Sequence, residues 1–267
     1  MSDFLLADEV APLIEKTIGE RHAHGMQKDI QEGRAARGSV ERLGKTIAIL
    51  NPDDPRSNHI FCFSSEDLDH LPTLLALYEG QEFQPAFYIS SAGFSSELSR
   101  ALATAGFYQA AFEQTLLYGR PHTKPVPPPE SISIAEVKEE EVDNYLEVIA
   151  EGFGWHPDWR DAAKDSVRRQ LQSPNLYPFI ARYEDEPIGT GALTVDGEIG
   201  GLSAAAVLPS HRNRGCHIAL LHARLYAAHK LGCSIIESGA TYGSASFRNQ
   251  QRIGLRIAYI ESEWKKL

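Results

Sequence analysis

The sequence predicts an α/β (α+β mixed sheet) fold with two αβ domains in tandem. Segments that alternate apolar and polar residues, as strands do, take turns with segments whose apolar residues recur at helical spacing. Five prolines stand within the nine residues 121–129, and proline removes a backbone donor and fixes φ, so we expect an extended connector there. The predicted units are a first domain at 1–120, the connector at 121–130 and a second domain at 131–267.

The second half carries the clearer pattern. Residues 131–137 alternate as a strand, and 138–152 predict a helix that begins with acidic residues, as the helix dipole favours. Residues 199–207 predict a strand rich in glycine and alanine, which we expect to be crowded by something close to its backbone. The other predicted elements are helices at 160–171, 218–231 and 244–253, and strands at 177–183, 188–194, 234–238 and 256–264.

The first half is less regular, and its longest helical pattern covers residues 8–31. The other predicted elements are strands at 45–50, 59–63, 86–90 and 108–117, and helices at 68–78 and 95–105.

A weak internal repeat links the two halves. Shifting the chain against itself by 148 residues gives 7 identities in the 24 positions 90–113, without a gap. Chance similarity between two β-α-β segments is the alternative. We favour duplication because the glycine after each helix, Gly106 and Gly254, keeps its register.

Composition narrows the class of function. The net charge of -10 argues against non-specific nucleic-acid binding, which depends on Lys and Arg neutralising phosphates. No run approaches the roughly 18 apolar residues of a membrane span, and the first residues lack the basic start of a signal peptide. The three cysteines are too widely spaced for a disulfide framework or a metal ligand set. These observations predict a cytoplasmic protein with reduced thiols, no metal and no membrane partner.

A basic turn stands between the alanine-rich strand and the helix that follows it. Two arginines and two histidines lie within the seven residues 211–217, a local reversal of charge in an acidic chain. A helix N-terminus offers unpaired backbone N–H groups and the positive end of the dipole, which together favour an anion such as phosphate. A basic turn that binds no ligand is the alternative.

The turn resembles the signature of the GCN5-related N-acetyltransferases, Arg/Gln-x-x-Gly-x-Gly/Ala between a strand and a helix. This chain has Arg212-Asn-Arg-Gly215-Cys-His217, so a histidine stands where the family has Gly or Ala. The flanking segments 205–209 and 218–221 and the closing segment 246–255 also fit the family. The resemblance covers roughly residues 131–267, and the first half is similar to the degenerate first copy of tandem members. The first half has no counterpart of the turn, so we expect one active site per chain.

The resemblance implies acetyl-CoA as the cofactor, with its diphosphate at the turn and its thioester carbonyl on the backbone of the preceding strand. Gly215 lets the backbone approach the diphosphate without a Cβ. Three polar residues spaced by three on the last helix can face the pantetheine or phosphates, or simply the solvent. The implied cofactor residues are Ala205, Ala206, Val207, Arg212, Asn213, Arg214, Gly215, Cys216, His217, Ser246, Asn249 and Arg252.

Acetyl transfer needs a base for the amine and benefits from an acid for the departing thiolate. The family's acid is usually a tyrosine four residues before the glycine after the last helix, and here Gln250 stands at that position. Tyr242 is the substitute candidate, and without an acid the thiolate can still leave because it is less basic than an amine. Glu237 and Glu198 are the candidate bases, acting through water, although a carboxylate at a strand end is commonly just solvated.

An aromatic segment at residues 153–159 lies where the family walls its acceptor site. Its rings suit an apolar or cationic amine, or they plug the domain against its neighbour. The candidate acceptor residues are Phe153, Trp155, His156 and Trp159.

These observations lead to an acetyl-CoA-dependent N-acetyltransferase that acts by direct attack of the primary amine of a small-molecule or amino-acid-like acceptor. The alternatives are an acyl-CoA-binding or regulatory module without catalysis, which the missing tyrosine favours, and a transferase of a longer acyl chain. The sequence names neither the acceptor nor the oligomeric state, with a homodimer among the options.

Overall fold

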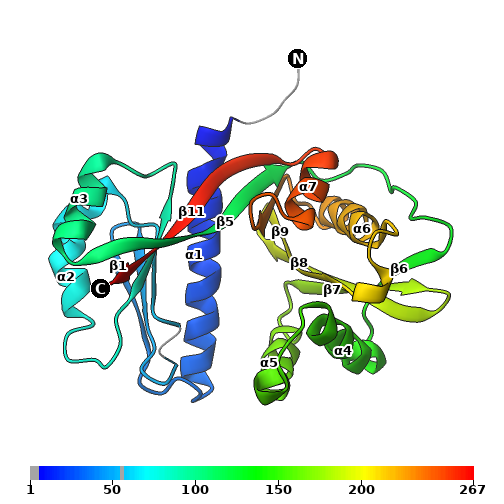
Figure 1. Cartoon of the computed structure of the whole chain (residues 1–267), viewed down its shortest axis with the longest axis horizontal. Coiled ribbons are helices and arrows are strands. Elements are labelled where there is room, and N and C mark those ends of the chain that lie inside the picture. The colour runs from blue at the N-terminus through cyan, green and yellow to red at the C-terminus, as the bar shows by residue number, and fades with distance from the viewer. Residues whose placement is uncertain (1–5, 55–56) are drawn as a thin grey trace. The chain divides into compact units, whose positions relative to one another are not determined.

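The structure is a computed structural model that describes residues 6–54 and 57–267 (Figure 1). It divides into two compact units. The first comprises residues 1–116 and 257–267, and the second comprises residues 117–256. The last segment of the chain therefore belongs to the first unit, whereas the sequence analysis assigned all of 131–267 to one domain.

In the first unit, helices cover both faces of a sheet with the strand order β1-β2-β3-β4-β11. Strands β3 and β4 are parallel, and the other pairs are antiparallel. One face packs on α1 and the other on α2 and α3, so Thr46–Leu50 is buried on both faces, as a covered strand must be. The elements are α1 (Ala7–Gln31), β1 (Ser39–Leu43), β2 (Thr46–Leu50), β3 (His59–Phe61), α2 (Leu71–Ala76), β4 (Ala86–Ser90), α3 (Ser96–Thr104), β5 (Phe107–Gly119) and β11 (Arg256–Lys266).

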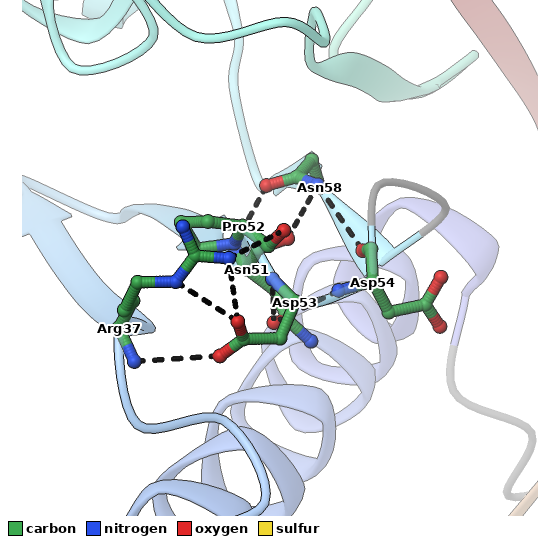
Figure 2. A network of polar contacts seen from close by, with 6 residues as sticks. All are labelled: Arg37, Asn51, Pro52, Asp53, Asp54 and Asn58. Carbon is green, nitrogen blue, oxygen red and sulfur yellow. Dashed lines mark hydrogen bonds and ion pairs between the residues drawn. The ribbon is translucent and has the colours of Figure 1, made fainter.

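A network of polar contacts closes the loop between β2 and β3 (Figure 2). The side chain of Asn58 accepts from the backbone N–H of Asn51 at 2.7 Å and donates to its carbonyl at 3.1 Å. The side chain of Asn51 accepts in turn from the N–H groups of Asp53 and Asp54. Arg37 forms an ion pair with Asp53 at 2.7 Å. These bonds satisfy polar groups that a partly buried loop leaves without a ladder partner.

The second unit is a sheet with the order β10-β9-β8-β7-β6, in which only β9 and β10 are parallel. Helix α6 covers one face and α4 with α5 the other (Figure 1). The elements are β6 (Ile132–Glu136), α4 (Val142–Gly152), α5 (Pro157–Gln170), β7 (Leu176–Tyr183), β8 (Glu186–Asp196), β9 (Ile199–Val207), α6 (Cys216–Lys230), β10 (Ile235–Ala240) and α7 (Ala245–Arg252).

The proline-rich segment lies along α6 within the second unit. The N–H of His122 donates to the carbonyl of Leu225 at 3.2 Å. Pro125, Val126 and Pro128 help to line a hollow of about 440 Å³ over α6 and the strands β6 and β7. The segment therefore contributes to the surface of this unit as well as connecting two parts of the chain.

In the part of the chain that the structure describes, each predicted strand and helix has a counterpart, and one strand, β1, was not predicted. Strand β1 was missed because its Glu41 and Arg42 interrupt the apolar pattern, as is common in an edge strand. The helix expected at 68–78 is shorter, since a 3-10 helix precedes α2 and Pro72 lies in its first turn. Both repeat segments fold as strand, helix and strand, and the glycines after the two helices, Gly106 and Gly254, have φ of 86° and 97°. None of the described helices combines the length and the apolar composition of a membrane-spanning segment.

Candidate functional site

The basic turn ends in a left-handed N-cap. Asn213 and Gly215 have φ of 64° and 81°, and α6 begins at Cys216 directly after them. Gly215 is exposed, and a helix leaves the first four of its N–H groups without intrahelical acceptors. These N–H groups and the positive end of the dipole of a 15-residue helix make this turn a suitable anion site.

The two arginines of the turn are already engaged with the protein. Arg212 donates from Nε to the carbonyl of Val207 at 3.2 Å and from Nη2 to the carbonyl of Gly152 at 3.0 Å. It therefore ties the end of β9 to the end of α4. The guanidinium of Arg214 lies 5.2 Å from the centre of the Tyr183 ring. What the turn offers an anion is mainly its backbone N–H groups, within the positive field of these side chains.

His217 presents a buried donor beside this turn. Arg252 donates to Oδ1 of Asn249 at 2.8 Å, so the Asn249 amide nitrogen, 3.3 Å from Nδ1 of His217, is the donor in that contact. The imidazole proton then resides on Nε2, which is buried and has no partner among the described residues. Burial, with a smaller contribution from the charge of Arg224, lowers the pKa of His217 to about 4, so the ring is neutral at pH 7.

These features fit a diphosphate at the turn. At the position where the family signature has a small residue, this chain has His217, whose buried Nε2 has no partner among the described residues. Cys216 contributes only its backbone, because its thiol is buried and burial raises the pKa of that thiol to about 12. On α7, Asn249 and Arg252 form the chain of contacts to His217, whereas the hydroxyl of Ser246 accepts from Gln250 at 3.1 Å.

Strand β9 carries a bulge just before the turn. Thr190 pairs with Ala206 and Ala192 with Ser203, so β9 has one more residue than β8 over this interval. Ala204 has φ of 53°, which is unusual for a residue with a side chain. The ladder between β9 and β10 runs from Ile199/Ile235 to Leu202/Ser238 and ends there, although both strands continue. Backbone groups of β9 beyond Leu202 thus face the side where β10 no longer pairs.

The structure separates the two candidate bases. Glu237 lies on β10 opposite Gly201, one position before the ladder ends, and is only 4% exposed. Glu198 is exposed and precedes the other end of β9, where its carboxylate accepts from the hydroxyl of Ser234 at 2.8 Å. Six residues of extended chain separate it from Ala204, or about 20 Å at roughly 3.3 Å per residue. The bulge and Glu237 lie near each other along the sheet, and Glu198 does not.

The candidate acid, Tyr242, and the residue at the usual acid position, Gln250, differ strongly in exposure. Tyr242 is 71% exposed in the loop between β10 and α7, with its ring 5.1 Å from that of Phe247. Gln250 is 2% exposed and occupies the buried face of α7. The position of the usual tyrosine is thus inside the protein here, and the exposed phenol is elsewhere in the same region of the chain.

The aromatic segment adjoins the bulge. The rings of Trp155 and Trp159 lie 5.9 Å apart, and those of Phe153 and Trp155 lie 6.5 Å apart and nearly parallel. Trp155 packs on the same apolar cluster as Ala204 and Ala206. A Cβ on Gly152 would lie 2.7 Å from the Cβ of Ala206, so this glycine allows α4 to end directly against β9.

The exposed rings of this segment are available to a ligand. Phe153 is 53% exposed and Trp159 is 48% exposed. Nδ1 of His156 accepts from the N–H of Asp158 at 3.3 Å and so caps α5. The described contacts of His156 are therefore local to the start of α5.

Sequence reasoning missed two buried polar residues at the bulge, Thr190 and Arg224. Both are 0% exposed. Arg224 occupies a core position of α6, eight residues after Cys216 and four after Leu220, where an apolar residue is expected. A charged residue in an apolar stripe was the signal that could have revealed it.

A family model described as the acetyltransferase (GNAT) family matches residues 135–246. The chain is similar to a GCN5-related N-acetyltransferase from Kribbella flavida, with a TM-score of 0.66 and 15% identity over 95% of each chain. It is also similar to one from Sphaerobacter thermophilus, with a TM-score of 0.59 and 16% identity over 97% of this chain and 93% of that one.

A third similar structure is a tandem GNAT protein from the clavulanic acid biosynthesis pathway. Its TM-score is 0.61, with 11% identity over 85% of this chain and 82% of that one. No curated protein matches the sequence. Residues 135–246 therefore form a domain of the acetyltransferase (GNAT) family, in a chain that has the fold of tandem GNAT proteins.

Proposed function

We propose that this protein is an acetyl-CoA-dependent N-acetyltransferase that acts on the primary amine of a small-molecule or amino-acid-like acceptor. The proposal rests on the path that the backbone of β9 follows. The strand bulges at Ala204 just beyond the point where β10 leaves it, and it then runs into the N-terminal turn of α6. One continuous segment thus offers N–H donors first to a thioester carbonyl and then to a diphosphate.

The residues of the turn hold the cofactor. The backbone N–H groups of residues 213–217 donate to the diphosphate, and the absence of a Cβ at Gly215 allows close approach. Asn249 and Arg252 keep the imidazole oriented. In this proposal Ala205, Ala206 and Val207 line the path of the pantetheine along β9.

Acetyl-CoA, when bound, supplies a thioester whose carbonyl carbon is open to attack by an amine. Glu237 removes the proton of the attacking amine through a water molecule, because its carboxylate lies near the end of the β9–β10 ladder. The N–H groups at the bulge stabilise the negative charge that develops on the carbonyl oxygen. Tyr242 donates a proton to the departing sulfur.

The aromatic rings of Phe153, Trp155 and Trp159 form the acceptor wall. A cluster of three rings next to the bulge favours a cationic or apolar amine, which binds over their faces. The similarity to structures named as N-acetyltransferases supports a nitrogen as the acceptor atom.

The test combines binding and turnover. Calorimetry with acetyl-CoA should show a single site per chain, and Gly215→Glu should abolish it, because the side chain places bulk and negative charge against the diphosphate. Release of free thiol in the presence of a panel of amines then identifies the acceptor. Absence of acetyl-CoA binding by the wild type, or unchanged affinity in Gly215→Glu, would remove the basis of the proposal.

An acyl-CoA-binding module without catalysis is the second candidate. The observation in its favour is the buried Gln250 at the position of the usual acid. This candidate requires tight acetyl-CoA binding with no thiol release for any amine, whereas the enzyme requires release with at least one.

A further inference from the structure

The two carbonyl groups that the β9 bulge displaces both accept hydrogen bonds from buried side chains. The carbonyl of Ser203 accepts from Nη1 of Arg224 at 3.0 Å. The carbonyl of Ala204 accepts from the hydroxyl of Thr190 at 3.2 Å. A bulge breaks the regular ladder, so its backbone groups need other partners, and these two side chains provide them.

Arg224 reaches the bulge from α6 through a gap that a glycine leaves open. A Cβ on Gly191 would lie 2.8 Å from the central carbon of the guanidinium. The same Nη1 also donates to the carbonyl of Ala192 at 3.0 Å, and Nε donates to that of Leu220 at 3.0 Å. Every partner is a carbonyl oxygen, and Nη2 has none in the described part of the chain. Arg224 thus clamps β8 and β9 together at the bulge.

The orientation of the bulge follows from the planarity of the peptide unit. In a trans peptide the C=O and the N–H point in opposite directions. The carbonyl of Ala204 points toward Thr190 on β8, so the N–H of Ala205 points away from β8. In the strand order β10-β9-β8, that direction is the side on which β10 has stopped pairing. The bond to Thr190 therefore determines where this N–H can donate.

We infer that Thr190 and Arg224 are positioning residues that hold the two peptide units at Ser203–Ala205 so that the N–H of Ala205 faces the thioester carbonyl. The inference rests on the proposed function, which places the carbonyl beside β9. The hydroxyl of Thr190 fixes the orientation of the peptide unit between Ala204 and Ala205. Arg224 fixes the peptide unit between Ser203 and Ala204 through the carbonyl of Ser203, and the same Nη1 also binds the carbonyl of Ala192 on β8.

A purely structural role would not require these residue types. Apolar side chains fill a core without the cost of desolvating a guanidinium, and a buried arginine that is paired only with carbonyls adds little to stability by itself. The described contacts of Arg224 and Thr190 at the bulge all concern the direction of backbone dipoles. A preorganised dipole facing a developing charge is the feature that acyl transfer requires.

The test measures the carbonyl directly and needs no acceptor. The full chain is saturated with [1-¹³C]acetyl-CoA, and isotope-edited infrared spectra give the carbonyl band relative to free acetyl-CoA. Hydrogen bonding to the N–H shifts the band of the wild-type complex to lower wavenumber. Thr190→Val keeps the shape of the side chain and should lose most of that shift, while affinity for desacetyl coenzyme A stays within about threefold.

Thr194→Val is the matched control. Thr194 is also buried on β8, but it pairs with Gly201 in the regular part of the ladder. This control should keep the wild-type band, and Thr190→Ser should restore it. Arg224→Met should also lose most of the band shift, as Thr190→Val does. Gly191→Ala crowds the guanidinium without removing it and should reduce the band shift to a smaller extent.

The outcomes separate the two proposals. A wild type that does not bind acetyl-CoA overturns the proposed function itself. A wild-type band shift that persists in both Thr190→Val and Gly191→Ala overturns the inference and leaves the proposed function standing. Equal loss of the shift in Thr190→Val and Thr194→Val would also overturn it, because the effect would then not depend on the bulge.

Discussion

Replacing Arg212 by alanine should loosen the aromatic segment more than it weakens cofactor binding. The change removes the two hydrogen bonds that Arg212 donates to Val207 and Gly152. Because Arg212 is exposed and solvent screens its charge, each bond contributes about 1 kcal/mol, the value of an ordinary hydrogen bond. The loss of about 2 kcal/mol corresponds to a melting temperature lower by roughly 4–8 °C in a unit of this size. If all of this free energy were lost from the transition state, kcat/KM for the amine would fall by about 30-fold, which is the upper limit of the effect.

The assay uses the tryptophans of the segment as reporters. Trp155 and Trp159 lie beyond Gly152, and a Trp264→Phe background removes the third tryptophan of the chain. Acrylamide quenching should increase in Arg212→Ala, because the end of α4 is no longer fixed to β9. Calorimetry should give an acetyl-CoA affinity within about threefold of that of the wild type.

Arg214→Ala is the control for the loss of charge. It removes the same unit of charge from the turn, but its guanidinium rests on Tyr183 and holds no backbone group of α4. Quenching should therefore remain unchanged in this variant. If Arg212→Ala instead lowers acetyl-CoA affinity tenfold or more, with a salt dependence that Arg214→Ala lacks, then Arg212 contacts the phosphates and the reasoning is refuted.

Two further predictions concern the acid and the first unit. Tyr242→Phe should lower turnover by at least about tenfold with little change in acetyl-CoA affinity, and a rate near that of the wild type would exclude Tyr242 as the acid. Burial raises the pKa of Glu15 from 4.5 to about 7, so between these pH values the unfolded chain holds fewer protons than the folded one and stability falls as the pH rises. Glu15→Gln removes that contribution, so urea unfolding at about pH 5 and about pH 8 should show a smaller loss of stability than in the wild type. Parallel pH dependences in the two proteins would contradict the burial of an ionisable carboxyl at this position.

The order of elements in this chain was predictable because periodicity alone identifies them. The strand 199–207 was placed to the residue, since its small side chains are bounded by the turn signal at 195–197 and by Pro209. The edge strand β1 was not predicted, because a strand that needs only one partner tolerates charged residues on its exposed face. The membership of β11 in the first unit could not be predicted from the sequence either. Pairing between distant strands depends on tertiary packing rather than on local pattern.

At the site, the sequence predicted where the backbone turns but not what the side chains do. Gly215 was recognised from the family signature, and the structure shows that it forms a left-handed N-cap, a conformation that favours glycine. The partners of Arg212 were not, because its two carbonyl acceptors lie 5 and 60 residues away along the chain. Glu198 and Glu237 looked alike in sequence, and only the extent of the β9–β10 ladder distinguishes them.

The membership of β11 in the first unit affects how the protein folds while the ribosome synthesises it. Trp264 belongs to the apolar core that α2 and α3 cover, and β11 pairs with β4 from Phe87 to Ser90. About 140 residues are made between Leu116 and that last strand, which takes roughly 7–28 s at 5–20 residues per second. Throughout this interval β4 presents an open edge, and the nascent first unit lacks part of its core. The first unit can therefore be completed only after the whole of the second unit has been synthesised, so a truncation within β11 would damage the first unit although most of that unit precedes the second in the chain.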